Sequence, residues 1–387
     1  VEHNVKEVLE GDNITIQINV YEGNKQLVEK INIKGNSVTN EAVIRAELLL
    51  DEGDPFNSLN LDKSIARLKS RNLFGAVTKE IKNGSNKDQK IIDISVEEKP
   101  TGEISAGAGI GTNGGSFAFN VSENNWLGKG MRVSTNLEVD ANSLKGELNV
   151  LHPNYNYSDN DLNYYISSAS NDKDTSGFKN TTLSSGIGTT FEQYKNVYLS
   201  PNLSVTHDDL KVSNEASASL KKQEGTFTDL SFDYGIQLDV RDRSFMPTEG
   251  YITSFNQTIP FYADTPFLRN AFSYRAYNSF TPNVIGAFKF YTAAINGLND
   301  EDVRVSKRIF LPGSLLRGFK AGRLGPRDLG DYVGGNYAVA VNFEAALPNL
   351  LPESTGTDVG LFLDLGNLWG VDYDSSVGNS NILRSST

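Results

Sequence analysis

Apolar and polar residues alternate with a period of two along most of the chain, from about residue 102 to residue 368. This period is typical of β-strands with one apolar face and one polar face. The pattern predicts about thirteen strands, most of them about 9–11 residues long. The clearest alternating segments are residues 117–122, 133–140, 144–150, 197–205, 232–241, 337–344 and 359–366.

The first hundred residues follow a different pattern, in which short alternating strands flank two stretches with helical spacing. Residues 40–50, with Thr39 as N-cap, and residues 59–71 are predicted to form two helices. With the flanking strands the order is β-α-α-β-β, an α+β unit of roughly 70 residues that can just bury a core. The unit is interpreted as a small adaptor, and its sheet could also be extended by an incoming peptide strand. Its predicted strands are residues 28–33, 77–81 and 91–96, and residues 13–21 form a strand of an earlier unit.

Two architectures share the period-two pattern of the C-terminal part, a soluble β-sandwich and a transmembrane β-barrel. The barrel is favoured because the polar face is rich in charged residues and because aromatic residues gather near strand ends. Turns also alternate between short, as at Asn113-Gly114, and long, as from Asn299 to Gly335. A barrel leaves no open edge in lipid, so we expect an even total of about sixteen strands. Beyond the thirteen strands counted here, about three would then be missing, and residues 381–383 are interpreted as the start of a strand.

Composition excludes several kinds of site. The chain has no cysteine, and His3, His152 and His207 lie far apart, so neither a disulfide framework nor a metal site is expected. The net charge of -12 argues against binding to nucleic acid. The sequence contains no run of about 18 apolar residues, so no transmembrane helix is predicted. A transmembrane barrel needs no such run.

No motif predicts an enzyme. The glycine-rich residues 107–115 superficially match a phosphate-binding loop, but a strand follows them instead of a helix. The pairs Asp208-Asp209 and Asp239 with Asp242 lack the spacing of a calcium-binding loop. No Ser/His/Asp arrangement of a hydrolase is recognised. We therefore expect no catalytic residue, no cofactor and no bound metal.

Several motifs, taken in order along the chain, carry a resemblance to a known family. They are VEKINIKGN (28–36), SRNLF (70–74), GAGIGTNGG with NNWLGKG (107–115 and 124–130), VRDRSFMPTEG (240–250) and LPGSLLRGF (311–319). They resemble the BamA family, in which an Arg-Gly-Phe/Tyr motif marks the long sixth extracellular loop. The resemblance implies an α+β POTRA domain (β-α-α-β-β) followed by an antiparallel transmembrane β-barrel, with about 16 strands in the full protein and about 13 here. The implied domains are the end of a preceding POTRA domain at 1–26, the last POTRA domain at 27–100, and a C-terminally truncated barrel at 101–387.

The same resemblance implies assembly and insertion of β-barrel proteins into the bacterial outer membrane, with the POTRA domain in the periplasm. The implied partners are unfolded outer-membrane proteins, accessory lipoproteins of the assembly complex and outer-membrane lipid, and no nucleic acid. The main alternative is a related POTRA-barrel translocation channel, of the TamA-like, two-partner secretion or organelle-import kind. A plain porin-like channel is the third possibility.

The Arg-Gly-Phe motif lies in a predicted loop of about 37 residues, a length that is uncommon unless the loop is functional. The alternation places Glu344 and Asp364 on the polar, lumen-facing side of neighbouring strands. A loop folded into the lumen would bring the Arg317 guanidinium to these carboxylates, with which it can form bidentate pairs. Gly318 would allow a close backbone approach, and Phe319 would pack on the barrel wall. An ordinary exposed loop arginine is the alternative, and the resemblance implies insertion.

The first predicted barrel strand, GEISAGAGIGT at residues 102–112, is rich in Gly, Ala and Ser. Such a strand buries little side-chain area and pairs weakly, so its edge could template an incoming unfolded strand. Small residues would also suit close packing against the loop or the POTRA domain. The resemblance implies that this seam is a lateral gate. The residues predicted to form it are Gly102, Ile104, Ala106, Ala108 and Ile110.

Overall fold

The computed structural model describes residues 2–10, 13–21, 25–111, 114–158, 160–320, 322–348, 350–351, 359–372 and 384–386. The turn residue Asn113 and the strand start predicted at residues 381–383 lie outside these ranges. The chain folds as two compact units. One comprises Val1–Gly102 with Glu123–Met131, and the other comprises Glu103–Ser122 with Arg132–Thr387.

The first unit contains the predicted β-α-α-β-β domain. It consists of β3 (Leu27–Lys34), α1 (Glu41–Arg45), α2 (Ser58–Ser70), β4 (Phe74–Asn83) and β5 (Gln89–Glu98). The sheet order is β3-β5-β4, with β3 parallel and β4 antiparallel to the central β5. Apolar side chains from both helices and all three strands form one core, which is how so small a domain buries enough surface to fold.

The first helix differs from the prediction at both ends. Its N-cap is Asn40, whose side chain accepts a hydrogen bond from the Ala42 N–H, and not Thr39. The helix ends at Arg45 instead of near residue 50. It ends early because the Leu49 N–H donates to the Ser64 hydroxyl on α2, which draws the chain away from the helical path.

A two-stranded antiparallel hairpin precedes this domain. Its strands are β1 (Glu2–Glu10) and β2 (Asn13–Tyr21), paired in unbroken register from Glu2 with Tyr21 to Glu10 with Asn13. The assignment of residues 1–26 to the end of a preceding domain stays a prediction.

Two sets of contacts within the first unit fix the loop before α1. The carboxylate of Glu98 accepts hydrogen bonds from the backbone N–H groups of Ser37, Val38 and Thr39 at 2.6–2.9 Å. Burial alone raises the pKa of Glu98, but these hydrogen bonds outweigh that effect and hold the pKa at about 2. The charged Glu98 carboxylate therefore holds this loop to β5 through hydrogen bonds.

The same loop contacts the turn between two later strands, β7 (Gly114–Trp126) and β8 (Met131–Asp140). Asn125 donates from Nδ2 to the Thr39 hydroxyl (2.9 Å), and the Asn40 N–H donates to the Gly128 carbonyl (2.8 Å). Gly128 has a φ of +69°, and a Cβ there would stand 2.1 Å from the Val38 carbonyl oxygen. Only glycine fits this position, both for its backbone conformation and for the close approach.

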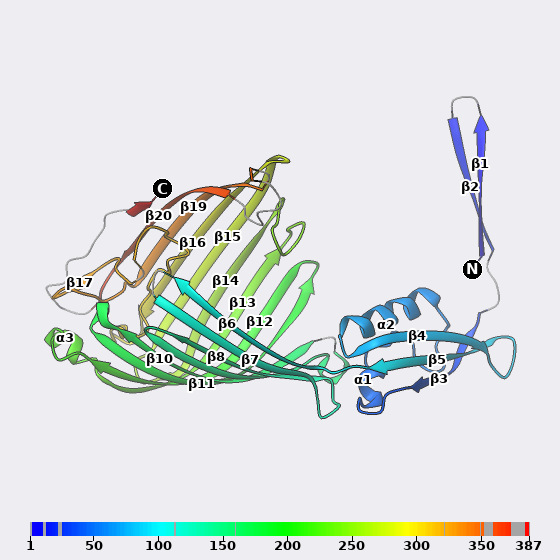
Figure 1. Ribbon diagram of the computed structural model, residues 1–387, viewed down its shortest axis with the longest axis horizontal. Helices are drawn as coiled ribbons and strands as arrows, with labels where there is room; N and C mark the ends of the chain where they lie inside the picture. Colours follow the sequence, from blue (N-terminus) through cyan, green and yellow to red (C-terminus); the bar gives the residue numbers. More distant parts are fainter. Residues whose placement is uncertain are drawn as a thin grey trace. The chain divides into compact units, whose positions relative to one another are not determined.

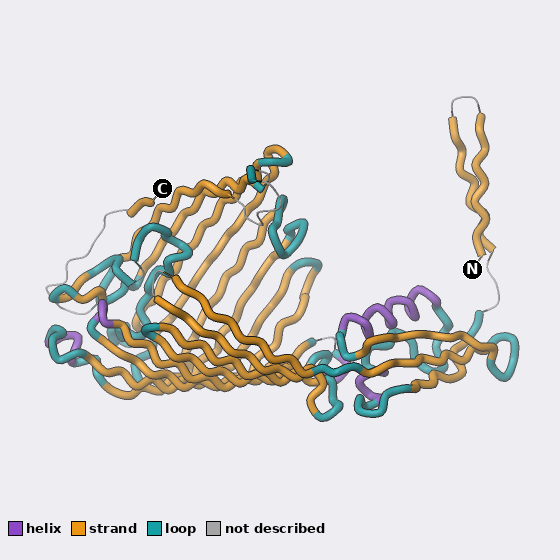
Figure 2. The backbone as a smooth tube through the Cα atoms, viewed as in Figure 1, coloured by secondary structure: helices purple, strands orange, loops and turns teal. Residues whose placement is uncertain are grey.

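The second unit is built on one antiparallel sheet of fourteen described strands, in the order β21-β20-β19-β16-β15-β14-β13-β12-β11-β10-β9-β8-β7-β6. Figure 1 shows these strands side by side in one curved wall, and Figure 2 shows that strands dominate this unit while the longest helix lies in the first. The strands are β6 (Gly102–Gly111), β7 (Gly114–Trp126), β8 (Met131–Asp140), β9 (Ser143–His152), β10 (Asp161–Lys173), β11 (Phe178–Tyr194), β12 (Val197–Val212), β13 (Gly225–Asp239), β14 (Gly250–Ala263), β15 (Phe267–Thr281), β16 (Val284–Gly297), β19 (Tyr337–Leu347), β20 (Val359–Trp369) and β21 (Arg384–Ser386).

Thirteen of these strands lie between Gly102 and Trp369, so the predicted sheet is confirmed. It is a single sheet, whereas a β-sandwich would need two sheets stacked face to face. Strand neighbours in the sheet are also neighbours in the chain, except that a long loop separates β16 from β19. That loop contains the short strands β17 (Arg327–Asp328) and β18 (Asp331–Tyr332). The described sheet is not closed, because β6 and β21 form its two edges.

Two faces of opposite character result from the alternation. One face carries a broad set of large apolar side chains with no protein covering them. So extensive an apolar surface is unstable in water and is typical of the lipid-facing side of a barrel. The other face carries the charged and polar residues and is covered in part by the long loop. The exposed apolar residues include Phe117, Phe119, Leu137, Leu148, Ile166, Leu183, Leu203, Leu230, Phe272, Phe343 and Leu361.

In the described part of the chain, no helix is both long enough and apolar enough to cross a membrane. The remaining short helices, η1 (Tyr155–Tyr157), η2 (Asp174–Ser176) and α3 (Ala218–Lys221), lie in connections between strands.

Candidate functional site

The loop between β16 and β19 lies on the polar face of the sheet. Its apolar side chains, among them Val303, Ile309 and Leu316, join a buried cluster with residues of the wall such as Ile295 and Leu368. A connection of this length is seldom ordered without a packing partner, and here the wall supplies that partner.

Arg317 of this loop contacts Glu344 and Asp364, the two carboxylates that the period-two pattern places on the polar face. Its Nε and Nη2 donate to the two oxygens of Asp364 on β20 at 2.7 and 2.6 Å, and its backbone N–H donates to Asp364 at 2.9 Å. A second ion pair joins Arg317 Nη2 to Glu344 on β19 at 2.7 Å. The side chain of Asp364 is 0% exposed, whereas that of Arg317 is 33% exposed. A buried carboxylate thus depends on one guanidinium for its charge balance.

Three wall residues that sequence reasoning missed complete this contact. Asn342 donates from Nδ2 to Asp364 at 2.8 Å and to the loop carbonyl of Leu315 at 2.9 Å. The Arg317 guanidinium lies 4.0 Å from the ring centroid of Phe362, a cation–π contact. Asn342 and Phe362 were detectable, because the period of two places them on the same face as Glu344 and Asp364.

The third missed residue, Lys289 on β16, pairs with Glu344 at 2.7 Å. Glu344 therefore keeps a cation when Arg317 is removed, whereas Asp364 loses the one cation that pairs with it within the described residues. The two carboxylates that Arg317 contacts therefore differ in how much they depend on it.

The other two residues of the motif also have defined places. Gly318 has a φ of +81°, a backbone conformation that favours glycine. Phe319 is partly buried and packs against the apolar cluster between loop and wall. The structure thus brings together Arg317, Phe319, Glu344 and Asp364, and Gly318 provides the turn between the first two.

The predicted first strand is β6, and it forms one edge of the described sheet. Ile104 and Ile110 are 72% and 96% exposed, and a Cβ added at Gly107 would meet no atom within 4 Å. Within the described residues of the second unit, close packing against the loop, one alternative explanation for the small residues, is not found around Gly107. Gly102, Ala106 and Ala108 are exposed as well, so all five residues predicted for the seam lie on an uncovered strand.

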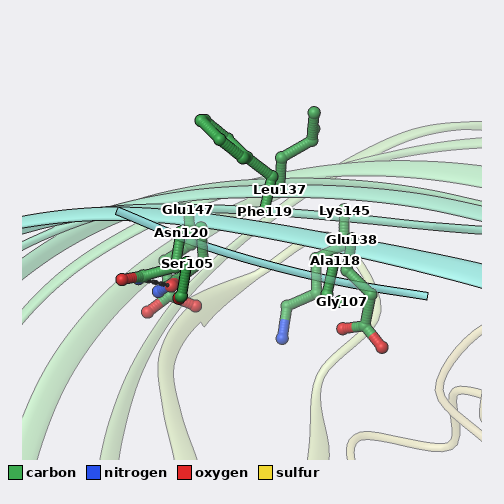
Figure 3. Close-up of a pocket in the computed structure, with 10 residues that line it drawn as sticks. Ser105, Gly107, Ala118, Phe119, Asn120, Leu137, Glu138, Lys145 and Glu147 are labelled. Carbon is green, nitrogen blue, oxygen red and sulfur yellow. Dashed lines mark hydrogen bonds between the residues drawn. The ribbon is translucent and has the colours of Figure 1, made fainter. Parts of the chain in front are cut away.

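A shallow pocket of about 320 Å³ lies beside this edge, over β6 to β9. Its floor is formed by small residues, Ser105 and Gly107 of β6 and Ala118 of β7. Figure 3 shows Glu138 and Glu147 on the polar side, while Phe119 and Leu137 point to the opposite side of the sheet. Side chains of a strand added to β6 would enter this open polar space, because side chains of paired strands share a face. Its lining residues are Ser105, Gly107, Ala118, Phe119, Asn120, Asn136, Leu137, Glu138, Lys145 and Glu147.

Among the described residues, no cluster of three or more His, Cys, Asp or Glu side chains is arranged to hold a metal ion.

Comparison with known proteins places this geometry in a family. The family model described as "Omp85 superfamily domain" matches residues 125–387. The chain belongs to the Omp85 superfamily. A second family model, POTRA, described as "Surface antigen variable number repeat", matches residues 26–99.

Individual members of the superfamily are similar over nearly the whole chain. "Outer membrane protein assembly factor BamA" of Neorickettsia risticii (strain Illinois) is 28% identical over 96% of this chain and 51% of that protein. The protein of the same name from Nitratidesulfovibrio vulgaris is 25% identical over 91% of this chain and 44% of that protein. The chain thus spans about half the length of the curated relatives it matches.

Among solved structures, the fold is similar to that of BamA from Haemophilus ducreyi lacking POTRA domains 1-3. The TM-score is 0.82 at 21% sequence identity, over 95% of this chain and 77% of that one. The resemblance to the BamA family and the predicted fold, a POTRA domain followed by an antiparallel barrel sheet, are confirmed.

Proposed function

We propose that this chain is the membrane-inserted part of an outer-membrane protein that assembles other β-barrels, with its POTRA domain in the periplasm. Its partners would be unfolded outer-membrane proteins, accessory lipoproteins and outer-membrane lipid. The relatives named as outer membrane protein assembly factors support this role. The exposed apolar face supports a place in lipid.

The observation that carries the proposal is the composition of β6, the first strand of the barrel sheet, in which Gly, Ala and Ser leave few side chains that can pack on a neighbouring strand. A strand edge offers unpaired N–H and C=O groups to any extended chain, a hazard that proteins in water usually cover. In lipid such an edge is costlier still, since no water is present to satisfy it. An unfolded substrate strand would satisfy it, and the weak side-chain packing of β6 would let that strand leave again.

Arg317 would hold the loop in place during this exchange. Its bonds to Asp364 join the loop to β20, which lies next to the other edge of the described sheet. The wall then stays ordered near one edge while the other accepts a strand. The energy would come from substrate strand pairing and apolar burial in lipid.

Cysteine cross-linking in the full-length protein tests the proposal. This chain has no cysteine of its own, so a cysteine at Ser105 on β6 gives an unambiguous signal. The protein is reconstituted in lipid vesicles with an unfolded barrel substrate that carries single cysteines along its terminal strand. We expect disulfides at one preferred register, because side chains pair at fixed positions along two strands.

The matched control places the cysteine at Ser168 on β10, an interior strand that is already paired on both sides. That variant should form no adducts. If the Ser105 variant inserted substrate normally yet formed none, β6 would not be the template. Passage of the substrate into the vesicle lumen, in place of insertion, would indicate a translocation channel.

A further inference from the structure

A second group of contacts holds the same loop to a distant part of the wall. Arg304 pairs with Asp229 on β13, with Nη2 2.7 Å from Oδ2, and both side chains are 2% exposed. Lys307 pairs with the same oxygen at 2.8 Å. On the neighbouring strand β12, Asp208 accepts a hydrogen bond from the Ser306 hydroxyl at 2.6 Å. Four successive loop residues thus include three that bind acids of β12 and β13.

This contact is not an efficient way to stabilise the fold. The Nε and Nη1 atoms of Arg304 and the Oδ1 atom of Asp229 are buried without a hydrogen-bond partner in the described structure. One face of the guanidinium is covered by the Phe227 ring, 4.2 Å from its centroid. An apolar pair of similar volume would avoid these unsatisfied groups and would be as stable or more so. The ion pair therefore provides something other than stability.

What an ion pair adds is position. We call the contact of Arg304 with Asp229 and that of Arg317 with Asp364 the two anchors of the loop. Between them, the loop packs on the wall through apolar contacts with residues such as Phe267, Ala293 and Ala338. Apolar contacts have no direction and allow a loop to slide. Charged pairs fix the register at each end, because a guanidinium in a water-poor space is stable only beside a carboxylate.

The two anchors lie far apart on the wall. β13 and β20 are separated by the four strands β14, β15, β16 and β19. At a strand spacing of about 4.8 Å, this is about 24 Å along the sheet. The segment from Arg304 to Arg317 can span that distance, since thirteen residues reach up to about 45 Å when extended. The loop is thus a brace across six strands.

We propose that Arg304, Lys307 and Asp229 form a second anchor that positions Arg317 for Asp364, so that the loop holds the wall from β13 to β20 in one fixed arrangement. Asp229 acts through the loop and is a positioning residue. The consequence for substrate insertion rests on the proposed function, whereas the position of the loop is tested independently of it.

The test compares Asp229→Asn with Asp233→Asn in the full-length protein in lipid vesicles. Both carboxylates lie on the same face of β13, four residues apart. Asp233, however, accepts hydrogen bonds only from other strand residues, Asn202, Ser204 and Thr258. The readout is hydrogen exchange of a peptide that covers residues 311–319, which includes the Arg317 amide bonded to Asp364. We expect about a tenfold rise in exchange for Asp229→Asn and no change for Asp233→Asn.

A double variant separates position from stability. Arg304→Met with Asp229→Leu replaces the buried charged pair with apolar side chains. Lys307 loses the same partner, but its side chain is 20% exposed and its ammonium group can reach water, so the melting temperature should stay close to that of the parent. Exchange at residues 311–319 should nevertheless remain raised, and substrate insertion should fall with it. This variant also keeps the test valid if Asp229→Asn does not fold.

Two outcomes would overturn the inference. In one, Asp229→Asn folds and its 311–319 peptide exchanges like that of the parent. In the other, the double variant restores both stability and slow exchange, which would make the pair a replaceable packing contact. If the parent itself inserted no substrate, the proposed function would fail, yet the exchange measurement would still decide the anchor.

Discussion

At the scale of single residues, the contact between Arg317 and Asp364 is the most demanding in the loop. Asp364 is fully buried, and Arg317 is the cation that pairs with it among the side chains that the structure describes, whereas Glu344 also pairs with Lys289. Removing Arg317 therefore leaves one uncompensated buried charge. Breaking such a pair costs roughly 3–5 kcal/mol when both partners are buried, and the partial exposure of Arg317 (33%) places the cost at about 3 kcal/mol.

We predict that Arg317→Ala lowers the unfolding free energy of the second unit by this amount. The measurement is a denaturant titration in lipid vesicles that follows the gel shift between folded and unfolded chains. Arg323→Ala removes an exposed arginine from the same loop and serves as control, with an expected change near zero. Equal stability of the two variants would contradict a locking role for Arg317.

The lowered pKa of Glu98 predicts that the stability of the first unit depends on pH. Its pKa of about 2 in the folded chain lies below the ordinary value of 4.5, so the folded state favours its charged form. The stabilisation is complete above about pH 4.5 and is lost as the pH falls towards about 2. Thermal unfolding followed at 222 nm reports mainly on α1 and α2, and its midpoint should drop over this window.

Glu98→Gln is the matched variant for that titration. It should be less stable than the parent at neutral pH and should show a smaller loss between pH 4.5 and 2, because it has no proton to take up. If the two curves ran parallel, the loop contacts of Glu98 would not be the source of the acid sensitivity.

At the scale of elements, the weakness of β6 is open to direct manipulation. A Cβ at Gly107 meets no atom within 4 Å, so Gly107→Ala introduces no clash. Alanine reduces the backbone entropy lost on strand formation and should strengthen the strand by about 0.5–1 kcal/mol. We predict slower hydrogen exchange in residues 102–111 and slower substrate insertion.

Gly146→Ala on the interior strand β9 provides the comparison, since a Cβ there also meets no atom within 4 Å. It should leave the insertion rate unchanged. Equal effects of the two substitutions on insertion would mean that β6 has no special part in it.

Local patterns allowed the strands and their faces to be predicted, because the side chains of a strand alternate whatever the strand pairs with. The same period placed Glu344 and Asp364 on one face, and the family resemblance implied that Arg317 inserts towards them. Helix ends were less certain. The N-cap of α1 is Asn40 instead of the predicted Thr39, because both residue types can cap a helix and the Thr39 hydroxyl here accepts a hydrogen bond from Asn125.

Contacts between the loop and distant strands could not be predicted. Arg304 and Asp229 are 75 residues apart, and no periodicity links a loop residue to a strand residue. Lys289 was missed for a related reason, since the partner of Glu344 depends on which strand follows β16 in the sheet. Contacts of this kind become visible only when strand order and loop path are both known.

At the scale of the whole molecule, the decisive property is that the apolar face of the sheet points outward. Leu148 in the middle of β9 is exposed on that face and pairs with Ile166. An arginine near the middle of a bilayer costs about 2–4 kcal/mol on the lipid-facing side of a barrel. We predict such a loss for Leu148→Arg, measured by denaturant titration in lipid vesicles.

Ser167→Arg is the control, because Ser167 pairs with Glu147 on the polar face and an arginine there meets a carboxylate. Its cost should be well below that of Leu148→Arg. A larger cost for Ser167→Arg would mean that the polar face, and not the apolar face, contacts lipid. The proposed place of the sheet in the membrane would then be wrong.

The two anchors of the loop also differ in when they can form. Asp229 precedes Arg304 by 75 residues, whereas Asp364 follows Arg317 by 47 residues. A chain that folds from its N-terminus can therefore fasten the base of the loop to β13 while β19 and β20 are still unfolded. Arg317 cannot reach its partner Asp364 until β20 has joined the sheet. Closure of Arg317 onto Asp364 thus marks the moment at which the growing wall has reached β20.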